Sequence, residues 1–247
     1  MHIMSDRQKF WGAFWRKGAI WRSGAALGTV LAALATPANA GQHNPQQDLI
    51  DRARISLDSY AAEPGMGTMR EMLGRASAVF IAPQIIKASF IVGLEGGSGV
   101  LLARNEQSQT WSAPSFYTIG GGSVGLQGGG EVSELILVVM TDRGLNAILK
   151  HQFKAGADAS IAVGPLGRGV EAATTTNLGA DIYSFSRSMG LFGGISVEGT
   201  IMQPRHSWNQ SYFGRELTPR EILEGAVPVD PGSDRLRQSL VAAAASE

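Results

Sequence analysis

The sequence predicts an α+β fold in which a compact, curled antiparallel β core is flanked by helices at both ends. Helical periodicity gathers near the two ends of residues 41–247, whereas short β-type segments separated by glycine fill most of the middle. Most gaps between these segments are too short for the crossover helices that parallel strands need. Glycine supplies 32 of the 247 residues, and small residues within strands favour tight curling, with closure into a barrel left open.

Two helices are expected ahead of the core, so residues 44–75 form a helical lead-in. Residues 45–60 carry an apolar stripe at helical spacing, and Asn44 precedes them as a capping residue. Pro64-Gly65 breaks this helix, and residues 68–75 form the second one.

The β core is expected over about residues 76–227. Its strands are expected at 79–82, 89–95, 99–104, 115–120, 124–128, 131–140, 160–163, 170–175, 181–188 and 191–200. The glycines at 96–97, 120–122 and 128–130 read as turns between them. Residues 135–140 have no polar face, which predicts a strand buried on both sides.

Three further helices complete the expected order. Thr141-Asp142 can cap a helix over about 143–154, and Thr218-Pro219 begins a short one that ends at Leu223. Residues 234–245 are expected to form a C-terminal helix of the single domain 41–247.

Residues 1–40 have the three parts of a secretory signal peptide. A basic region precedes twelve uncharged residues at 24–35, and Ala38-Asn39-Ala40 supplies the small-residue cleavage site. The alternative is an uncleaved interfacial anchor, because tryptophans alternate with the cations. Cleavage predicts a periplasmic or secreted protein, with peripheral membrane association left open.

Composition excludes several classes of protein. The chain has no cysteine and four scattered histidines, so we expect no disulfide, no metal centre and no cofactor. Loss of residues 1–40 removes five cations and one acid, which leaves 16 cations and 20 acids, a net charge of −4. A chain of that charge is not attracted to nucleic acid or acidic membranes by its overall field.

Two glycine-rich motifs resemble catalytic or phosphate-binding loops. Residues 121–125 match the G-x-S-x-G nucleophile elbow, but the residues after Ser123 cannot form the helix that an elbow requires. Residues 93–99 lack both the helix that follows a dinucleotide loop and the Lys-Ser/Thr ending of a P-loop. Both motifs are therefore read as turns, and no catalytic residue is expected.

Basic side chains offer the best candidates for a binding site. On the helix expected at 143–154, Arg143, Lys150 and Lys154 lie away from the apolar side, a pattern that can meet phosphate head groups. The alternative is an ordinary surface helix with solvated lysines. Arg168 and Arg187 can supply bidentate phosphate contacts, although structural ion pairing is the default for each.

Six strings of residues stand out, at 111–117, 156–160, 164–168, 183–192, 197–199 and 212–214. Together and in this order they resemble the SYLF domain, a lipid-binding domain of bacterial secreted proteins and eukaryotic actin and membrane adaptors. The resemblance implies a non-enzymatic domain with a compact β core that binds phosphoinositides or other acidic phospholipids. It is also the only source of a link to actin.

The expected function is therefore lipid binding by a non-enzymatic SYLF-domain protein exported to the bacterial envelope. The alternative is a structural or scaffolding envelope protein without lipid specificity. Acidic phospholipids or a membrane surface are the expected partners, and a protein partner in the envelope is the other.

Overall fold

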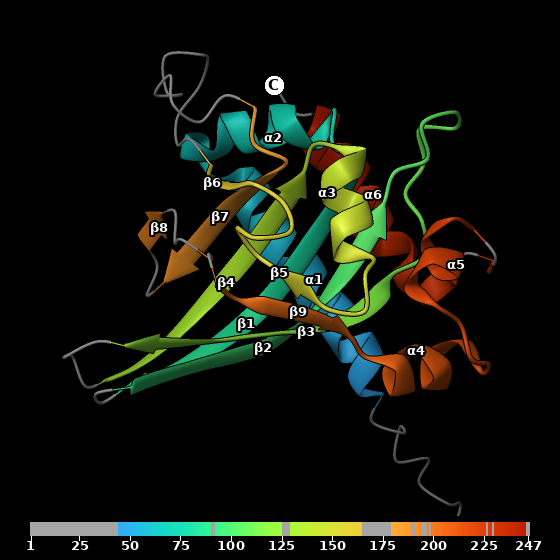
Figure 1. The fold of residues 1–247 in the computed structure, drawn as a ribbon. Helices are drawn as coiled ribbons and strands as arrows, with labels where there is room; N and C mark the ends of the chain where they lie inside the picture. The colour runs from blue at the N-terminus through green and yellow to red at the C-terminus, as the bar shows by residue number, and fades with distance from the viewer. Residues whose placement is uncertain are drawn as a thin grey trace, which may run out of the picture. The chain divides into compact units, whose positions relative to one another are not determined.

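The computed structural model describes most of the chain after the expected leader (Figure 1). The described residues are 44–89, 92–124, 129–164, 179–188, 191–193, 197, 199–225, 227–228 and 230–245. The expected leader 1–40, the expected strand at 170–175 and Arg168 lie outside them.

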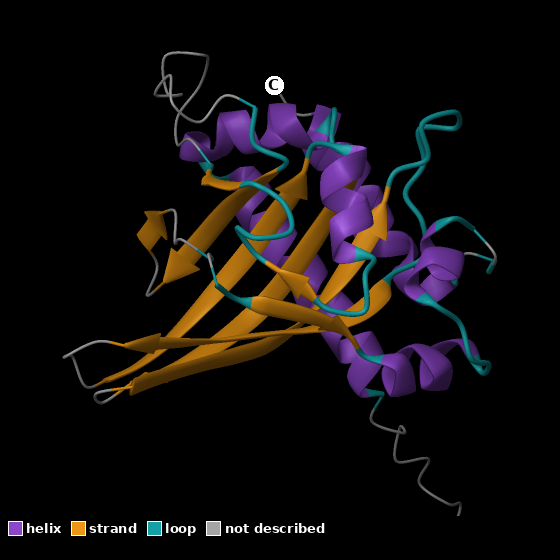
Figure 2. Cartoon of the chain, viewed as in Figure 1, coloured by secondary structure: helices purple, strands orange, loops and turns teal. Residues whose placement is uncertain are grey.

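In the described part of the chain, one nine-stranded sheet forms the centre of the fold (Figure 2). Its strands are β1 (Ala78–Ser89), β2 (Val92–Ala103), β3 (Ser115–Val124), β4 (Gly129–Val139), β5 (Phe153–Lys154), β6 (Ile161–Val163), β7 (Ile182–Ser188), β8 (Leu191–Gly193) and β9 (Ile201–Pro204). The strand order is β5-β9-β3-β2-β1-β4-β7-β6, with β8 paired to β7. All pairs are antiparallel except β6 with β7, which is parallel. The α+β class is confirmed, with this one pair as the exception to an antiparallel core.

The sheet curls into a half-barrel. Its edge strands β5 and β6 follow each other in the chain, and the turn between them holds a single bridge from Ala155 to Ala159. Within the described residues no ladder joins β5 to β6, so the curled sheet stays open there.

The described residues contain six α-helices, which pack around the sheet. They are α1 (Pro45–Ala62), α2 (Gly67–Leu73), α3 (Asp142–Ile148), α4 (His206–Phe213), α5 (Pro219–Leu223) and α6 (Pro231–Ala245), with a 3₁₀ turn at Pro64–Met66. Helices α1, α2 and α6 pack on the convex face, where they share one core with alternate residues of β1, β2 and β4. The other residues of these strands form a second core on the concave face, which includes Ala147 and Ile148 of α3.

Helix α1 begins at the expected capping residue and buries the expected apolar stripe. The Asn44 side chain accepts hydrogen bonds from the amides of residues 46 and 47, and Pro45 occupies the first turn. Leu49, Ala53 and Leu57 are buried against the sheet. The stripe therefore fixes the helix on the convex face.

Strand β4 is buried on both sides, as the run of apolar residues predicts. Leu135, Leu137 and Val139 enter the concave core, whereas Ile136 and Val138 enter the convex core. This strand therefore links the two cores through the middle of the sheet.

The prediction that the glycine runs are turns is wrong for residues 96–97 and 120–122, because β2 and β3 continue through them. It is also wrong for residues 129–130, which are the first two residues of β4. Strand β1 has a bulge between Ile81 and Gln84, and β2 passes close beneath it. A Cβ at Gly97 would overlap the Gln84 carbonyl oxygen, and one at Gly99 would overlap the Phe80 ring. These glycines allow two strands to approach each other rather than to turn.

The helix expected over 143–154 is also shorter than predicted. Helix α3 ends at Ile148, and Phe153 pairs with Met202 as part of β5. Phe153 is fully buried in the concave core, so tertiary burial overrides the helical pattern after residue 148. Helix α4 was not predicted; its buried Asn209 accepts a hydrogen bond from the Phe116 amide at 2.8 Å.

Candidate functional site

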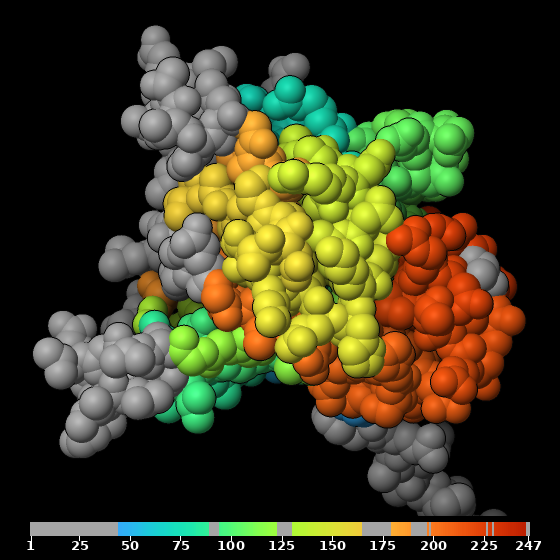
Figure 3. Space-filling view, in the orientation of Figure 1, coloured from blue at the N-terminus to red at the C-terminus, as the bar shows by residue number. Residues whose placement is uncertain are grey.

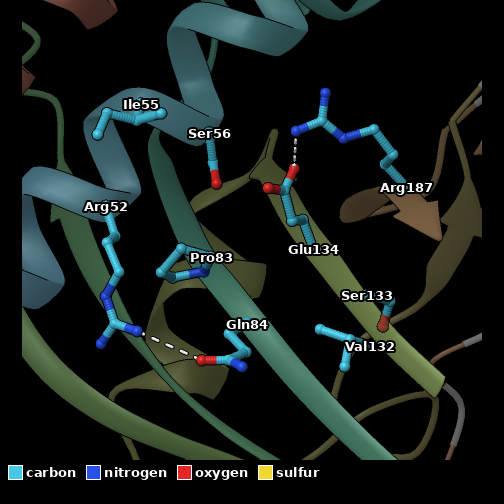
Figure 4. Close-up of a pocket in the computed structure, with 9 residues that line it drawn as sticks. All are labelled: Arg52, Ile55, Ser56, Pro83, Gln84, Val132, Ser133, Glu134 and Arg187. Atoms are coloured by element: carbon cyan, nitrogen blue, oxygen red, sulfur yellow. Dashed lines mark hydrogen bonds and ion pairs between the residues drawn. The ribbon is translucent and has the colours of Figure 1, made fainter. Parts of the chain in front are cut away.

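A hollow of about 350 Å³ opens between α1 and the convex face of the sheet (Figure 4). Its lining comes from α1 (Arg52, Ile55, Ser56), β1 (Pro83, Gln84), β4 (Val132, Ser133, Glu134) and β7 (Arg187). The hollow is a candidate site because it places two arginines beside apolar side chains that remain exposed.

Arg52 is the accessible cation of the hollow. It lies on the exposed side of α1, and its Nη1 donates to Gln84 Oε1 at 3.3 Å (Figure 4). A hydrogen bond of that length to a neutral amide is weak and exchanges readily with a stronger acceptor. Arg52 can therefore turn to an anion without breaking a salt bridge that the structure records.

Arg187, a residue that the sequence singles out, lies on the opposite wall in an ion pair with Glu134 (Figure 4). Its Nη1 donates to Ser59 Oγ at 2.5 Å, and its Cζ lies 5.4 Å from the centroid of the Tyr60 ring. Its side chain is 21% exposed. This geometry is the structural ion pair that was the default expectation for Arg187. The residue therefore borders the hollow with its charge already neutralised by Glu134.

Tyr60 contacts Arg187 and Glu134 as a structural residue, although it does not line the hollow itself. Burial, with a further contribution from the Glu134 charge, raises the pKa of the Tyr60 phenol far above its ordinary value, against the opposing effect of Arg187. The phenol therefore stays protonated, and its Oη donates to the Glu134 carbonyl oxygen at 3.2 Å.

Apolar side chains complete the chemistry of the hollow. Ile55 on α1 is 57% exposed and Val132 on β4 is 53% exposed. An exposed guanidinium beside aliphatic groups suits a ligand with an acidic head and an apolar part. The nine lining residues contain no histidine and no paired carboxylates, which are the usual groups for acid–base chemistry.

The three cations expected on one helix are divided among three parts of the chain. Arg143 lies in the first turn of α3, Lys150 follows the end of α3, and Lys154 lies on β5. The common basic helix face predicted for them is therefore wrong, because the chain leaves the helix to bury Phe153. The α3–β5 segment, yellow in Figure 3, forms part of the molecular surface.

Arg143 binds a buried carboxylate. Its Nε donates to Asp181 Oδ1 at 3.1 Å and its Nη2 to Oδ2. The Thr141 hydroxyl, the Ser160 amide and the Ser160 hydroxyl donate to the same carboxylate. The Arg143 guanidinium holds the pKa of the Asp181 carboxyl well below its usual range, against the opposing effect of burial. Arg143 thus ties α3 to the start of β7.

Lys150 and Lys154 lie near one acid. Lys150 Nζ is 3.8 Å from Asp158 Oδ1 and its side chain is 61% exposed. The Lys154 side chain is exposed, while its amide donates to Asp158 Oδ2 at 2.6 Å. The last sequence candidate, Arg168, lies outside the described residues.

Ser123 of the G-x-S-x-G motif lies within strand β3. Its backbone pairs with Gly93 of β2, and the next described element is strand β4. A nucleophile elbow needs a strand followed at once by a helix, which this arrangement does not provide.

No group of three or more metal-ligating side chains comes together among the described residues. No helix within that part of the chain is long and apolar enough to cross a membrane.

Sequence reasoning missed Arg52, Ile55 and Val132. Only Ile55 carries a local signal, because it is an isoleucine on the polar side of an amphipathic helix. The hollow itself joins residues far apart in the chain, from α1 to β7, so no local pattern predicts it.

The family described as "Ysc84: Las17-binding protein actin regulator" matches residues 120–243, half of the chain. The SH3 domain-containing YSC84-like protein 1 of Rattus norvegicus is 36% identical over 157 residues, 63% of this chain and 46% of that protein. Protein YSC84 of Saccharomyces cerevisiae is 33% identical over 172 residues, 68% of this chain and 36% of its own length. LAS seventeen-binding protein 3 of the same species is 34% identical over 169 residues, which is 67% of this chain and 36% of that protein.

The chain thus spans less than half the length of these curated relatives. The match begins within β3 and ends within α6, so it covers β4 to β9 and α3 to α5 completely. The resemblance to the SYLF domain is confirmed, and the chain belongs to the Ysc84 (SYLF) family.

Proposed function

We propose that this chain is a non-enzymatic binding protein whose hollow between α1 and β4 receives the head group of an acidic lipid. The family description and the name of the yeast LAS seventeen-binding protein 3 both refer to binding of another molecule rather than to a reaction. The observation that carries the proposal is the exposed Arg52 guanidinium beside exposed Ile55 and Val132.

The expected affinity of a single molecule of ligand is low. One cation near an anionic surface contributes about 1 kcal/mol, and Glu134 already neutralises Arg187. The net charge of −4 for residues 41–247 adds no long-range attraction. Binding should therefore be short-range, and it should weaken as salt screens the Arg52 charge.

Co-sedimentation with vesicles tests the proposal. The purified chain is mixed with phosphatidylcholine vesicles, with or without phosphatidic acid or a phosphoinositide, at low and physiological salt. We expect Arg52→Gln to reduce binding to the acidic vesicles about fivefold, the equivalent of one cation's contribution. Lys150→Gln is the matched control, because it removes an exposed cation outside the hollow.

Two outcomes contradict this assignment. If Lys150→Gln lowers binding and Arg52→Gln does not, the lipid contact lies on the α3–β5 segment. If no acidic vesicle binds the wild-type chain, lipid binding is refuted for this protein. A protein partner then becomes the leading candidate, because the family description and the name of one yeast relative both specify binding of a protein.

Export is the second part of the proposal. The basic, apolar and small-residue segments of residues 1–40 support cleavage after Ala40 and a periplasmic or secreted location. An exported chain would meet lipid head groups of the envelope rather than cytosolic ligands. A connection to actin would then require delivery to another cell.

A further inference from the structure

The outer parts of β1 to β4 form a four-stranded ribbon that projects beyond the helices (Figure 1). The charged residues of this ribbon lie on the face that continues the concave face of the sheet. Lys87 of β1 lies opposite Glu95 of β2 on one side and Glu131 of β4 on the other. Because side chains alternate along a strand, Lys87 shares its face with Ile85, a member of the concave core.

The other face of the ribbon is apolar and exposed. Ile86 is 55% exposed, Leu94 is 70% exposed and Val132 is 53% exposed. A strand with one solvated face normally places polar residues there, so this pattern is reversed. Exposed apolar patches of this kind mark interaction surfaces.

Large and small residues alternate in a regular way on this surface. We call it the outer ribbon face, and it consists of Ile86 and Ala88 on β1, Leu94 and Gly96 on β2, and Val132 and Gly130 on β4. One cross-strand row contains Ile86, Gly96 and Val132, and the next contains Ala88, Leu94 and Gly130. Each strand therefore offers one large and one small position, two residues apart.

The small positions are not required by the packing of the chain itself. A Cβ at Gly96 would lie 3.8 Å from the nearest heavy atom outside its chain neighbours, and one at Gly130 would lie 4.0 Å away. Gly97, on the opposite face, has no such space. The glycines of the outer ribbon face therefore leave shallow gaps that open outward.

We infer that the outer ribbon face docks against the same face of a second copy, as a two-fold dimer. The two-fold axis lies in the plane midway between the two facing sheets. It runs perpendicular to the strands and passes between the two cross-strand rows of each copy. It sets the row with Ile86 against the row with Ala88 of the partner. Leu94 then faces Gly96 and Val132 faces Gly130 in the other copy, so every large side chain meets a gap.

Charge and helix position support this arrangement. None of the six residues carries a charge, so two such faces meet without repulsion or buried ions. Helix α1 packs over the base of the ribbon, where Arg52 meets Gln84. An axis perpendicular to the strands points the two bases in opposite directions, which keeps the α1 helices of the two copies apart.

The area of the face predicts a weak dimer. The ribbon has four strands about 4.8 Å apart, each with five paired residues at about 3.3 Å per residue, which gives a flat area of roughly 320 Å² per copy. Stable interfaces bury at least ~1,000 Å² in total, so we expect reversible association at micromolar concentration rather than a permanent dimer.

A swap of large and small residues tests the inference. Sedimentation velocity of the purified chain at about 10–300 µM measures association. Gly96→Leu sets leucine against leucine, and Leu94→Gly sets gap against gap, so each should weaken the dimer at least tenfold. The double variant restores one leucine opposite one glycine and should return the dissociation constant to within threefold of wild type. Neither residue lines the hollow, so these variants leave the lining of the hollow unchanged.

Three results overturn the inference. They are a wild-type chain that stays monomeric throughout the range, single variants that dimerise as wild type does, and a double variant that folds but does not recover. Increased binding of Gly96→Leu to neutral vesicles without loss of dimer would assign the face to a membrane surface instead. If Gly96→Leu does not fold, Gly96→Ala replaces it, since its Cβ fits the monomer and should still weaken the dimer about threefold.

Discussion

Replacement of Asp181 by asparagine is expected to destabilise the protein by about 3 kcal/mol. The residue is 4% exposed, and its carboxylate accepts from Thr141 Oγ1 at 2.7 Å, from the Arg143 guanidinium, and from the Ser160 amide and hydroxyl at 3.0 and 2.7 Å. These bonds join the start of α3, the segment before β6 and the start of β7.

The size of this destabilisation follows from the hydrogen bonds that the asparagine side chain can no longer accept. Asparagine keeps one oxygen and replaces the other by a donor, so about two hydrogen bonds to a charged acceptor are lost, at roughly 1.5–3 kcal/mol each. The Arg143 side chain is 71% exposed and can turn to water, which lowers the net loss to about 3 kcal/mol.

The effect should depend on pH with a definite sign. The pKa of the Asp181 carboxyl is depressed in the folded protein, chiefly by Arg143. Its stabilisation is therefore fully present above the unfolded pKa near ~4 and is lost as pH falls toward the lower folded pKa. The difference between wild type and Asp181→Asn should be largest near neutrality and should shrink below pH ~4.

Urea unfolding at several pH values measures this difference. Asp142→Asn is the matched control, because it changes an exposed acid in the first turn of α3. If the two variants differ by less than about 0.5 kcal/mol at pH 7, the Asp181 cluster does not hold these segments together and the reasoning fails.

Two further predictions concern a buried hydroxyl and the leader. Tyr117 Oη is buried without a hydrogen-bond partner among the described residues, so Tyr117→Phe should leave the free energy of unfolding unchanged or raise it by about 1 kcal/mol; a loss above that size in urea unfolding would indicate a bound water. Intact-mass analysis of the exported protein should give a chain that begins at Gly41, and a main species that retains residues 11–21 would favour the interfacial anchor.

Periodicity predicted the elements whose burial follows the local pattern. The stripe of α1 and the uniformly apolar run of β4 each satisfy one simple rule, and the structure places them accordingly. The errors occur where contact with a strand far away in the sequence determines the local structure. Gly97 and Gly99 belong to a continuous strand because the bulge of β1 lies against them, and no residue near them in the chain reports that bulge.

The candidate site was less predictable than the fold. Arg187 was identified from its place on a strand, but its neutralisation by Glu134 depends on the register of β7 with β4. Arg52 looks like an ordinary surface cation of α1 until the sheet places Gln84 and Val132 beside it. A positive charge predicts a possible contact with phosphate, whereas the acid that cancels it comes from the tertiary fold.

The hollow and the outer ribbon face are physically linked through Val132. This residue lines the hollow and also belongs to the face on which the second copy is proposed to dock. If each occupant covers Val132, a ligand in the hollow and a second copy on the ribbon exclude each other, and each weakens the other by the same factor. The swap variants separate the two effects, because Gly96→Leu removes the second copy without changing the hollow. A gain in acidic-vesicle binding by that variant would therefore measure how much of the hollow the dimer covers, while equal binding would show that both sites can be filled at once.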